Sequence, residues 1–570
     1  MVPKLFDFLH ANHELRKNLK NDIIYIKHEF GMISAVIQDD DIRGGCRSGS
    51  EEAHMVWINM CVRNKFAAEI RELKNRSEDA SKLREAYINN SSNTSSPAWS
   101  LSSEQDDHAD GAQMITIVGF HGMGKTLLAN HVYKEIESQY EARAWVPPTK
   151  TGAAADVLKE ILRQLGHLPI PPRFFIVIDD LRTATYWCDM KEAFVGLSGR
   201  FLVTTAIQHV ANTCKKSAVH DHVYTMTTLA DQDSRLLFFK EAFQDDDLPL
   251  DAEELGSEAL KKCDGLPLAL VTTARFLQST GNPTPMKWAK LCSNLGTHLE
   301  SVELLARMRR VLVRSYTSLD SQVARTFLLY LGTYPSGRPI RKSSLLRRWL
   351  AEGLSPGDST CSALDTAIIN FDKLVDRSII QTMDTSGKST EVKTCHTHGM
   401  MLEFVLRKSM LDNFVTVLYN RQSTPGLPNN IRRLALHHAR PREVKGLTLV
   451  RSLTVLGEAH PSVLDFSKYQ LLRVLDLEEC VEPLGDRHLK LICTKLLLLR
   501  YLCLGAAVIA TSLPKEISKL QLLDTLDVRN TPIEILPTQV LELPHLLHLF
   551  GKFKLKQDIG GRRMSKLQTW

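Results

Sequence analysis

The sequence predicts a multidomain chain: an α-helical N-terminal bundle, an α/β phosphate-loop domain, a mostly helical middle region and a C-terminal leucine-rich-repeat solenoid. Three observations support this fold class. Apolar residues recur at helical spacing near the start, a glycine-rich loop occupies residues 119–126, and a leucine frame recurs after residue 430. The 570 residues leave room for about three to five domains of roughly 100–200 residues each.

Composition narrows the class of protein. Lys plus Arg is 71 and Asp plus Glu is 65, and this net charge of +6 is too small to indicate a nucleic-acid partner. The eleven cysteines include no C-x-x-C pair, which disfavours zinc-ribbon and redox sites and predicts a reduced, intracellular chain. The longest apolar run, residues 496–510, is too short for a membrane span and contains Arg500.

Residues 1–90 are predicted to be helical, because apolar side chains recur at steps of three and four. The stripe consists of Leu15, Leu19, Ile23, Ile26, Phe30, Ile33 and Ile37. Such stripes usually pack inside a bundle, and a surface for self-association is the alternative. The stretch at residues 91–112 is rich in Ser and then acidic, as in a flexible linker.

An α/β domain follows the linker. Continuous apolar runs that alternate with helical patterns predict a parallel sheet covered on both faces. These runs are residues 114–120, 143–146, 173–180 and 200–205. Residues 229–410 are predicted to be mostly helical, with a break at Gly265 and Pro267 before a helix resumes.

The frame L-x-x-L-x-L recurs six times from residue 431 onward. The six frames start at residues 431, 450, 472, 499, 523 and 546. Spacings of 19, 22, 27, 24 and 23 residues are those of leucine-rich repeats, each of which forms one short strand and buries its leucines against its neighbours. Chance clustering of leucines is the alternative. The chain ends in repeat-like sequence, so the array is predicted to be incomplete.

The segment GFHGMGKT fits the phosphate-loop pattern G-x-x-x-x-G-K-T, with Gly119, Gly124, Lys125 and Thr126 at the fixed positions. Glycine lets backbone N–H groups converge on phosphate oxygens. The lysine supplies a charge to the outer phosphates, and the threonine hydroxyl a ligand to Mg²⁺. Because a predicted strand precedes the motif and a predicted helix follows it, a chance match to the phosphate-loop pattern is a poor alternative.

The run FFIVIDD has the form of the strand that ends in carboxylates beside the metal. We assign Asp179 to Mg²⁺, mostly through water, and Asp180 to the attacking water as the catalytic residue. Two carboxylates that cap a helix are the alternative. The histidine pairs at 220 and 222 and at 437 and 438 are interpreted as solvated loop residues rather than metal ligands.

The order of these motifs resembles plant disease-resistance proteins of the coiled-coil, NB-ARC, leucine-rich-repeat class. The motifs in order are IVGFHGMGKTLLA, ARAWV, FFIVIDDL, RFLVTT, CDGLPLAL, FLLYLGTYPSG with IRKSSLLRRWLAEGL, and CHTHGMML. The resemblance implies a coiled-coil-type domain (1–90), a linker (91–112), a nucleotide-binding domain (113–222), a helical domain (223–300), a winged-helix domain (301–420) and repeats (430–570).

The resemblance also implies a cytoplasmic immune receptor in which bound ADP, exchanged for ATP with Mg²⁺, acts as a switch. Pro267 would lie against adenine, and His398 would reach the β-phosphate from the winged helix. The other implied nucleotide-binding residues are Gly119, Gly122, Met123, Gly124, Lys125, Thr126 and Leu127. The implied partners are other copies of the chain, a paired receptor, and a pathogen effector or guarded host protein at the repeats.

Several positions depart from the family pattern. The acidic block expected at residues 57–66 is absent, and a Ser-rich linker replaces the segment that closes over adenine. Ala206 replaces an arginine that would contact the γ-phosphate, which predicts weaker discrimination between ATP and ADP, and Arg182 replaces a tryptophan. Gly399 replaces the aspartate of Met-His-Asp, which predicts a closed state weaker by about 1.5–3 kcal/mol, one charged hydrogen bond.

Three functions remain open on the sequence alone. The first is a binding switch that is at most a slow ATPase, the second a multi-turnover phosphate-loop ATPase, and the third a degenerate relative or interaction protein that binds no nucleotide. Loss of an arginine at residue 206 disfavours the second function, because the transferring phosphoryl group has one cation fewer. The missing adenine-side segment keeps the third function open.

Overall fold

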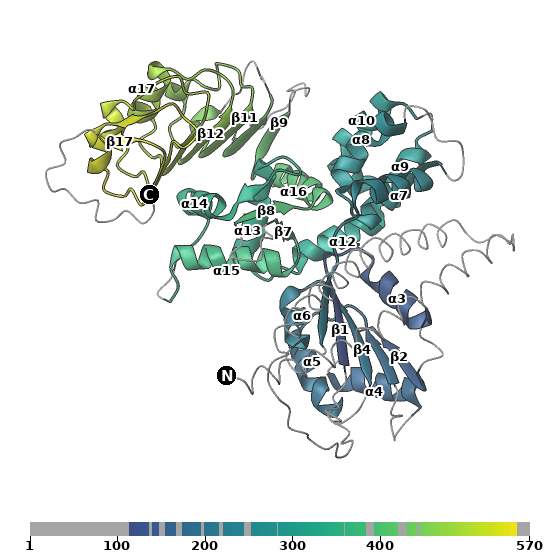
Figure 1. Ribbon diagram of the computed structural model, residues 1–570. Helices are drawn as coiled ribbons and strands as arrows, with labels where there is room; N and C mark the ends of the chain where they lie inside the picture. Colours follow the sequence, from purple (N-terminus) through teal and green to yellow (C-terminus); the bar gives the residue numbers. More distant parts are fainter. Residues whose placement is uncertain are drawn as a thin grey trace, which may run out of the picture.

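The computed structural model describes residues 113–555, apart from residues 136–139, 148–153, 167–173, 195–198, 216–220, 244–251, 282, 358–359, 384–392, 420–429, 440, 442–443 and 445. The predicted N-terminal bundle, the linker and residues 556–570 lie outside the described residues. The chain folds into an α/β domain, two largely helical regions and a repeat region (Figure 1).

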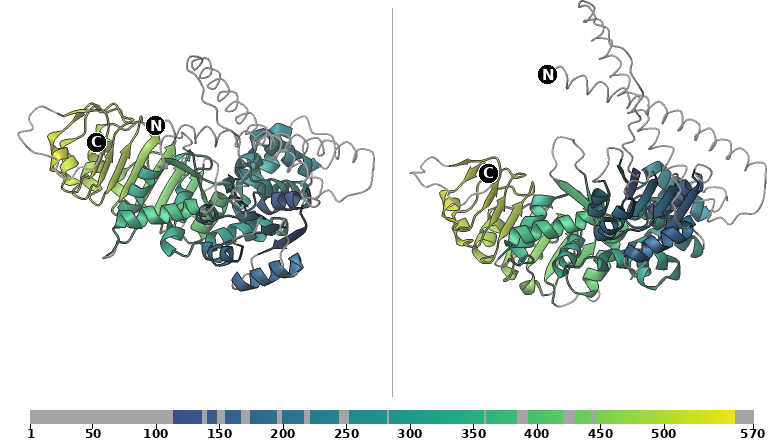
Figure 2. Two further views of the ribbon diagram at one scale, coloured as in Figure 1. Left: turned by 60° about the horizontal axis from the view of Figure 1, so that its bottom comes forward. Right: turned by 90° about the horizontal axis from the view of Figure 1, so that it is seen from below.

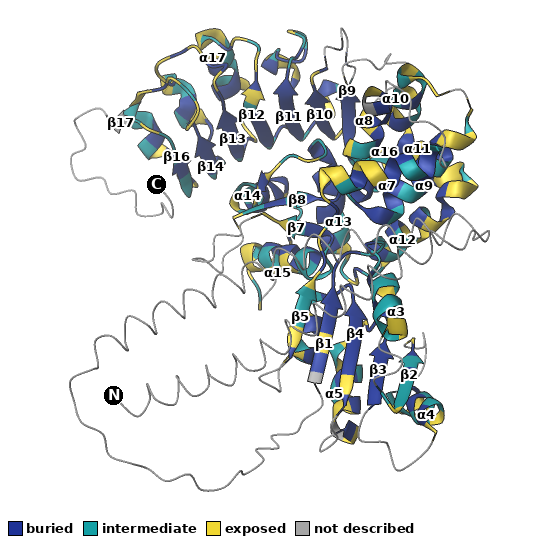
Figure 3. Cartoon of the chain, turned by 45° about the vertical axis from the view of Figure 1, so that its right-hand side comes forward, coloured by how far each residue is buried: buried dark blue, intermediate teal, exposed yellow. Residues whose placement is uncertain are grey.

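The first domain is built on a five-stranded parallel sheet with the strand order β2-β3-β4-β1-β5. One face packs against α4, α5 and α6, and the other packs against α3 and the helices that follow the domain. The predicted parallel sheet, covered on both faces, is confirmed, and β3 and β4 are buried along most of their length (Figure 3). The elements are β1 Gln113–Val118, α3 Lys125–Glu135, β2 Ala142–Val146, α4 Ala154–Leu165, β3 Phe174–Ile178, α5 Ala184–Lys191, β4 Arg200–Thr205, α6 Gln208–Cys214 and β5 His222–Thr225.

The next region has five helices among its described residues. The predicted break lies between α8 and α9, where Gly265 has φ +67°. A Cβ on this glycine would lie 2.5 Å from the carbonyl oxygen of Leu229, so the turn requires glycine. Pro267 is the first residue of α9, a position where its missing N–H is tolerated. The helices are α7 Asp231–Phe243, α8 Ala252–Cys263, α9 Pro267–Ser279, α10 Pro285–Ser293 and α11 Leu295–Ser301.

The third region combines helices with a small antiparallel sheet in the order β6-β8-β7, as in a winged helix. Trp349 and Phe327 stack at its centre, with ring centroids 3.9 Å apart. The elements are α12 Ala306–Thr317, α13 Gln322–Tyr330, β6 Ile340–Arg341, α14 Lys342–Glu352, α15 Ala363–Asp376, β7 Ile380–Thr382, β8 Thr394–Thr397 and α16 Gly399–Leu411.

The repeats form a seven-stranded parallel sheet in the order β16-β14-β13-β12-β11-β10-β9. The central leucines of the six predicted frames pair in register across neighbouring strands: Leu434, Leu453, Leu475, Leu502, Leu526 and Leu549. The predicted repeats are therefore confirmed, and β9 adds one strand before the first frame. The strands are β9 Thr416–Tyr419, β10 Arg433–His437, β11 Ser452–Gly457, β12 Val474–Cys480, β13 Tyr501–Leu504, β14 Thr525–Asp527 and β16 His548–Phe550; helix α17 Asp486–Lys495 and a pair of short strands, β15 Ile535–Leu536 and β17 Lys554–Leu555, lie outside the sheet.

The interpretation of two histidines as solvated loop residues is wrong. His437 is buried on β10, and its Nε2 lies 3.0 Å from the carbonyl oxygen of Thr333 in the winged-helix region. Burial lowers the pKa of His437 to about 4, so the ring is neutral. His222 is exposed but lies on β5 rather than in a loop.

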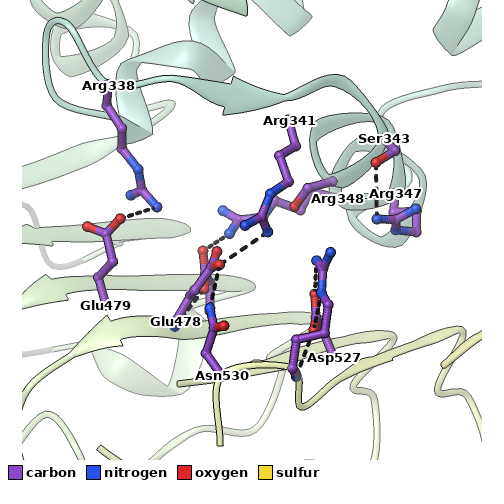
Figure 4. A network of polar contacts seen from close by, with 12 residues as sticks. Arg338, Arg341, Ser343, Arg347, Arg348, Glu478, Glu479, Asp527 and Asn530 are labelled. Atoms are coloured by element: carbon purple, nitrogen blue, oxygen red, sulfur yellow. Dashed lines mark hydrogen bonds and ion pairs between the residues drawn. The ribbon is translucent and has the colours of Figure 1, made fainter. Parts of the chain in front are cut away.

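The winged-helix region lies between the five-stranded parallel sheet and the repeats, which occupy opposite ends of an arc (Figure 2). Its arginines face acidic residues of the repeat strands (Figure 4). Arg348 of α14 forms an ion pair with Asp476 of β12, and both side chains are almost fully buried, with exposed fractions of 2% and 0%. Arg338 pairs with Glu479 at 2.8 Å, and Arg341 with Glu478 at 3.2 Å.

A second buried pair lies beside the first. Arg433 of β10 donates to the Glu352 carboxylate at the end of α14, with an N–O distance of 3.0 Å. Two buried ion pairs thus join α14 to the repeat sheet. A charge left buried without its partner is strongly destabilising, so these pairs fix how the repeats sit on the winged-helix region.

We expect Asp476→Asn to loosen this interface, because it leaves the buried Arg348 guanidinium without its counter-charge. Removing one partner of a buried ion pair costs about 3–5 kcal/mol. The measurement is amide hydrogen exchange in α14 and β12, which should become faster. Glu479→Gln is the matched control, since Glu479 is half exposed and such pairs contribute about 0–1 kcal/mol. Equal exchange in the two variants would contradict this assignment.

Candidate functional site

The phosphate loop connects β1 to α3 and lies at the carboxyl edge of the sheet. Gly122 and Gly124 have φ of +88° and +91°, which side chains other than glycine rarely adopt. A Cβ on Gly122 would lie 3.1 Å from the Cβ of Leu268 in α9. The N–H of Leu268 also donates to the Gly122 carbonyl at 3.2 Å. The helix that begins at Pro267 therefore packs directly on the loop.

Lys125 is the first residue of α3, and its side chain reaches back into the loop. Its Nζ donates to the carbonyl oxygens of Gly119 and Phe120, at 2.7 and 2.9 Å. Burial lowers the pKa of Lys125 to about 8, against the opposing effect of the carboxylates of Asp180 and Asp179. A buried ammonium enclosed by a glycine-rich loop at a helix N-terminus has the chemistry that holds phosphate oxygens.

The residues predicted to hold a metal ion lie together. The Thr126 hydroxyl donates to Asp179 Oδ1 at 2.8 Å, and the Thr204 hydroxyl donates to the same oxygen at 2.6 Å. Hydroxyl and carboxylate oxygens beside a phosphate loop are the ligands that Mg²⁺ takes in such sites. The donor set fits a Mg²⁺–nucleotide complex.

Asp180 has an environment that the sequence did not predict. Its backbone is left-handed, with φ +68°. Its carboxylate pairs with Arg182 at 3.0 Å and also with Arg314 of α12. The carboxylate assigned to an attacking water is thus engaged by two guanidinium groups, one of them 134 residues away in the chain.

Two other predicted residues face the core. Met123 is buried with an exposed fraction of 2%, and Leu127 packs on the core between the sheet and the helical region. Only their backbone N–H groups could face a phosphate. Pro267 is buried at the start of α9, on the side from which this helix meets the loop.

His398 brings the winged-helix region to the phosphate loop. Its ring is fully buried and stacks on Phe120 of the loop, with centroids 5.4 Å apart and planes 13° from parallel. Burial lowers the pKa of His398 to about 3, helped by His396, so the ring is neutral. Neither ring nitrogen has a hydrogen-bond partner among the described residues. A buried imidazole with open nitrogens beside the loop suits a nucleotide ligand.

Gly399 lies where the helical and winged-helix regions meet, and the weaker closed state expected there stays a prediction. A carboxylate is present at this point, but it comes from Asp264, which accepts a hydrogen bond from the Gly399 N–H at 3.1 Å. A Cβ on residue 399 would lie 2.3 Å from the Lys262 carbonyl oxygen. Lys262 itself pairs with Glu403 of α16 at 2.6 Å. The helical and winged-helix regions are therefore closed without an aspartate at 399, and there is no room for one.

Three residues of the site are not predicted by the sequence: His121, Asp264 and Arg314. His121 contacts the hydroxyl of Ser315 on α12 at 3.2 Å, and burial lowers its pKa to about 4. His121 and Asp264 lie inside recognised motifs, at positions that those motifs leave variable. No local pattern marks Arg314, because its partner lies in another domain.

Comparison with known families agrees with this architecture. The NB-ARC domain matches residues 103–170, the disease resistance protein winged helix domain matches residues 333–405, and a leucine-rich repeat region matches residues 449–569. Two proteins of Oryza sativa subsp. japonica, each named disease resistance protein RGA4, are similar over most of the chain. One is 44% identical over an alignment 476 residues long that covers 78% of this chain, and the other is 36% identical over an alignment 663 residues long, gaps included, that covers 98% of this chain.

The chain belongs to the plant NB-ARC leucine-rich-repeat disease-resistance proteins. It spans 46% and 65% of the lengths of the two RGA4 relatives. Among solved structures, a variant of RuvB from Thermotoga maritima matches 50% of this chain and 84% of its own, at 12% identity and a TM-score of 0.27. No helix among the described residues of this NB-ARC protein has the length and apolar character to cross a membrane.

We expect Gly399→Ala to destabilise this NB-ARC protein, because the added Cβ would overlap the Lys262 carbonyl oxygen. Overpacking of this kind typically costs about 1–3 kcal/mol. The measurement is the thermal unfolding midpoint together with hydrogen exchange in α8 and α16. Gly332→Ala is the control, since a Cβ there would meet its nearest atom at an ordinary 3.5 Å. A variant at 399 as stable as the one at 332 would show that this contact is not tight.

Proposed function

We propose that the chain is a cytoplasmic plant immune receptor that acts as a nucleotide-dependent switch, with ADP and Mg²⁺ in the closed state and ATP in the open state. The observation that carries the proposal is the stacking of His398 on Phe120. This contact couples the winged-helix region to the phosphate loop, so a change at the loop alters how the domains pack. The disease-resistance names of the relatives support the biological role.

The residues of the chain have separate tasks in this switch. Lys125 and the loop N–H groups bind the phosphates, and Thr126 and Asp179 orient Mg²⁺, which supplies positive charge beside the phosphates when bound. The neutral His398 ring offers a nitrogen to the β-phosphate side from the winged helix. Arg348 and Arg433 hold the repeats against the winged-helix region, which restrains opening until a ligand of the repeats competes for the interface.

The proposed partners follow from the same arrangement. Release of the closed state would free the nucleotide-binding domain and the N-terminal helical domain for self-association or for a paired receptor. The repeats would contact a pathogen effector or a guarded host protein. Of the acidic strand residues that meet the winged-helix arginines, Glu478 would become more accessible if that interface opened, whereas Glu479 is already half exposed.

A multi-turnover ATPase is less well supported than a switch. A carboxylate that orients water must be able to reach that water, whereas the Asp180 carboxylate is paired with Arg182 and Arg314. A relative without nucleotide binding is the second candidate. It is kept open by the Ser-rich stretch at residues 91–112, which replaces the segment that closes over adenine in the family pattern.

The deciding experiment is to denature the purified full chain and identify the nucleotide it releases. ADP near one per chain supports the switch. Steady release of phosphate from added ATP supports the ATPase. A protein that is folded but yields no nucleotide, and takes up none, supports the second candidate and overturns the switch.

We expect Lys125→Ala to give a folded protein that retains little ADP, because the variant lacks the ammonium that faces the phosphates. A hydrogen bond to a charged group contributes about 1.5–3 kcal/mol, or roughly 10- to 150-fold in affinity. The measurement is the ADP content per chain after purification, with circular dichroism to confirm folding. Lys134→Ala removes an exposed lysine from the same helix and should leave the ADP content unchanged. Equal ADP in the two variants would reject the role of Lys125.

A further inference from the structure

A cavity of about 180 Å³ lies beside the phosphate loop, between the nucleotide-binding domain and the winged-helix region. On one side it is lined by His121 of the loop and by the residues that follow β3 and β4, including Arg182 and Ala206. On the other side it is lined by Arg314 of α12 and by Arg377, the C-cap residue that follows α15. Ligands of α/β sheets bind at this carboxyl edge of the strands.

The cavity carries an excess of positive charge. Three of its lining residues are arginines, and Asp180 is the one carboxylate among its lining residues. Asp180 already pairs with both Arg182 and Arg314. Within the described part of the chain, the Arg377 guanidinium has neither an ion pair nor a hydrogen bond. Two of the three cationic charges are therefore not neutralised by the cavity itself.

The neutral groups of the cavity do not offset this excess. Burial, Lys125 and the arginines Arg182 and Arg377 keep the pKa of His121 near 4, although Asp180 opposes them, so its ring is uncharged. Ser315, which contacts His121, and Ser318 also line the cavity, but their hydroxyls donate to the carbonyl oxygens of Val311 and Ser315 at 3.0 and 2.8 Å. The guanidinium groups are the donors that suit phosphate oxygens, since the planar guanidinium fork matches two oxygens at once.

We propose that this cavity is a phosphate site in which Arg377 and Arg314 bind the terminal phosphate of a nucleoside triphosphate or free inorganic phosphate. These arginines supply the positive charge that an arginine at residue 206 would supply in the family pattern, where this chain has Ala206. Binding of a nucleotide phosphate in this cavity rests on the proposed function, whereas binding of free inorganic phosphate does not. Because both arginines come from the winged-helix side and His121, Arg182 and Ala206 from the nucleotide-binding side, a phosphate bound here contacts both domains.

The test is to measure the dissociation constants of ADP, of a non-hydrolysable ATP analogue and of inorganic phosphate for the full chain. The variant is Arg377→Gln, because the Arg377 side chain forms no ion pair with the described residues that the substitution would break. Arg310→Gln is the matched control, because Arg310 is an exposed arginine on α12 outside the cavity. Arg377→Lys keeps the charge but not the fork, so it should fall between the parent and Arg377→Gln.

We expect Arg377→Gln to weaken binding of the ATP analogue, of inorganic phosphate or of both about tenfold. The dissociation constant of ADP should stay within twofold of the parent value. Arg310→Gln should change none of the three. Weakening of the analogue alone assigns the cavity to the nucleotide, and weakening of inorganic phosphate alone assigns it to the free anion. If the parent binds phosphate but no nucleotide, the switch fails and the cavity site stands. Unchanged affinities in a folded variant, equal weakening of ADP and the analogue, or a parent that binds none of the three would overturn the proposal.

Discussion

The closed packing of the winged-helix region against both of its neighbours is the constraint on which the rest of the structure depends. At one end His398 buries its ring on Phe120, and at the other Arg348 buries its charge on Asp476. If these contacts opened, the imidazole with its open nitrogens and the unpaired guanidinium would both have to be hydrated, because a buried polar group without a partner is unfavourable. The nucleotide loop and the repeats are thus linked through one central region.

The two ends of this link differ in chemistry. The contact at the loop is between rings, with a histidine kept neutral by burial. The contact at the repeats is ionic, with buried pairs at its centre and half-exposed pairs at its rim. Buried pairs define geometry more than they add stability, because desolvation offsets much of the attraction.

The departures from the family pattern acquire a physical meaning in this fold. The aspartate missing at 399 has a counterpart in Asp264, which reaches the same backbone N–H from the helical region. The arginine missing at 206 lies beside a cavity that three other arginines line. In both places the charge is present but comes from a different segment of the chain. Substitutions that look like losses in a motif can therefore be relocations in space.

The sequence by itself determined the features that depend on local pattern. The phosphate loop, the parallel strands, the break at Gly265 and Pro267, and the ladder from Leu434 to Leu549 all follow from spacing and residue type within short windows. The tertiary structure alone decided the rest. It paired Asp180 with Arg314, buried His437 on Thr333 and placed Asp264 against Gly399. These contacts join residues more than a hundred positions apart, and their geometry depends on how whole domains pack, which no local periodicity records.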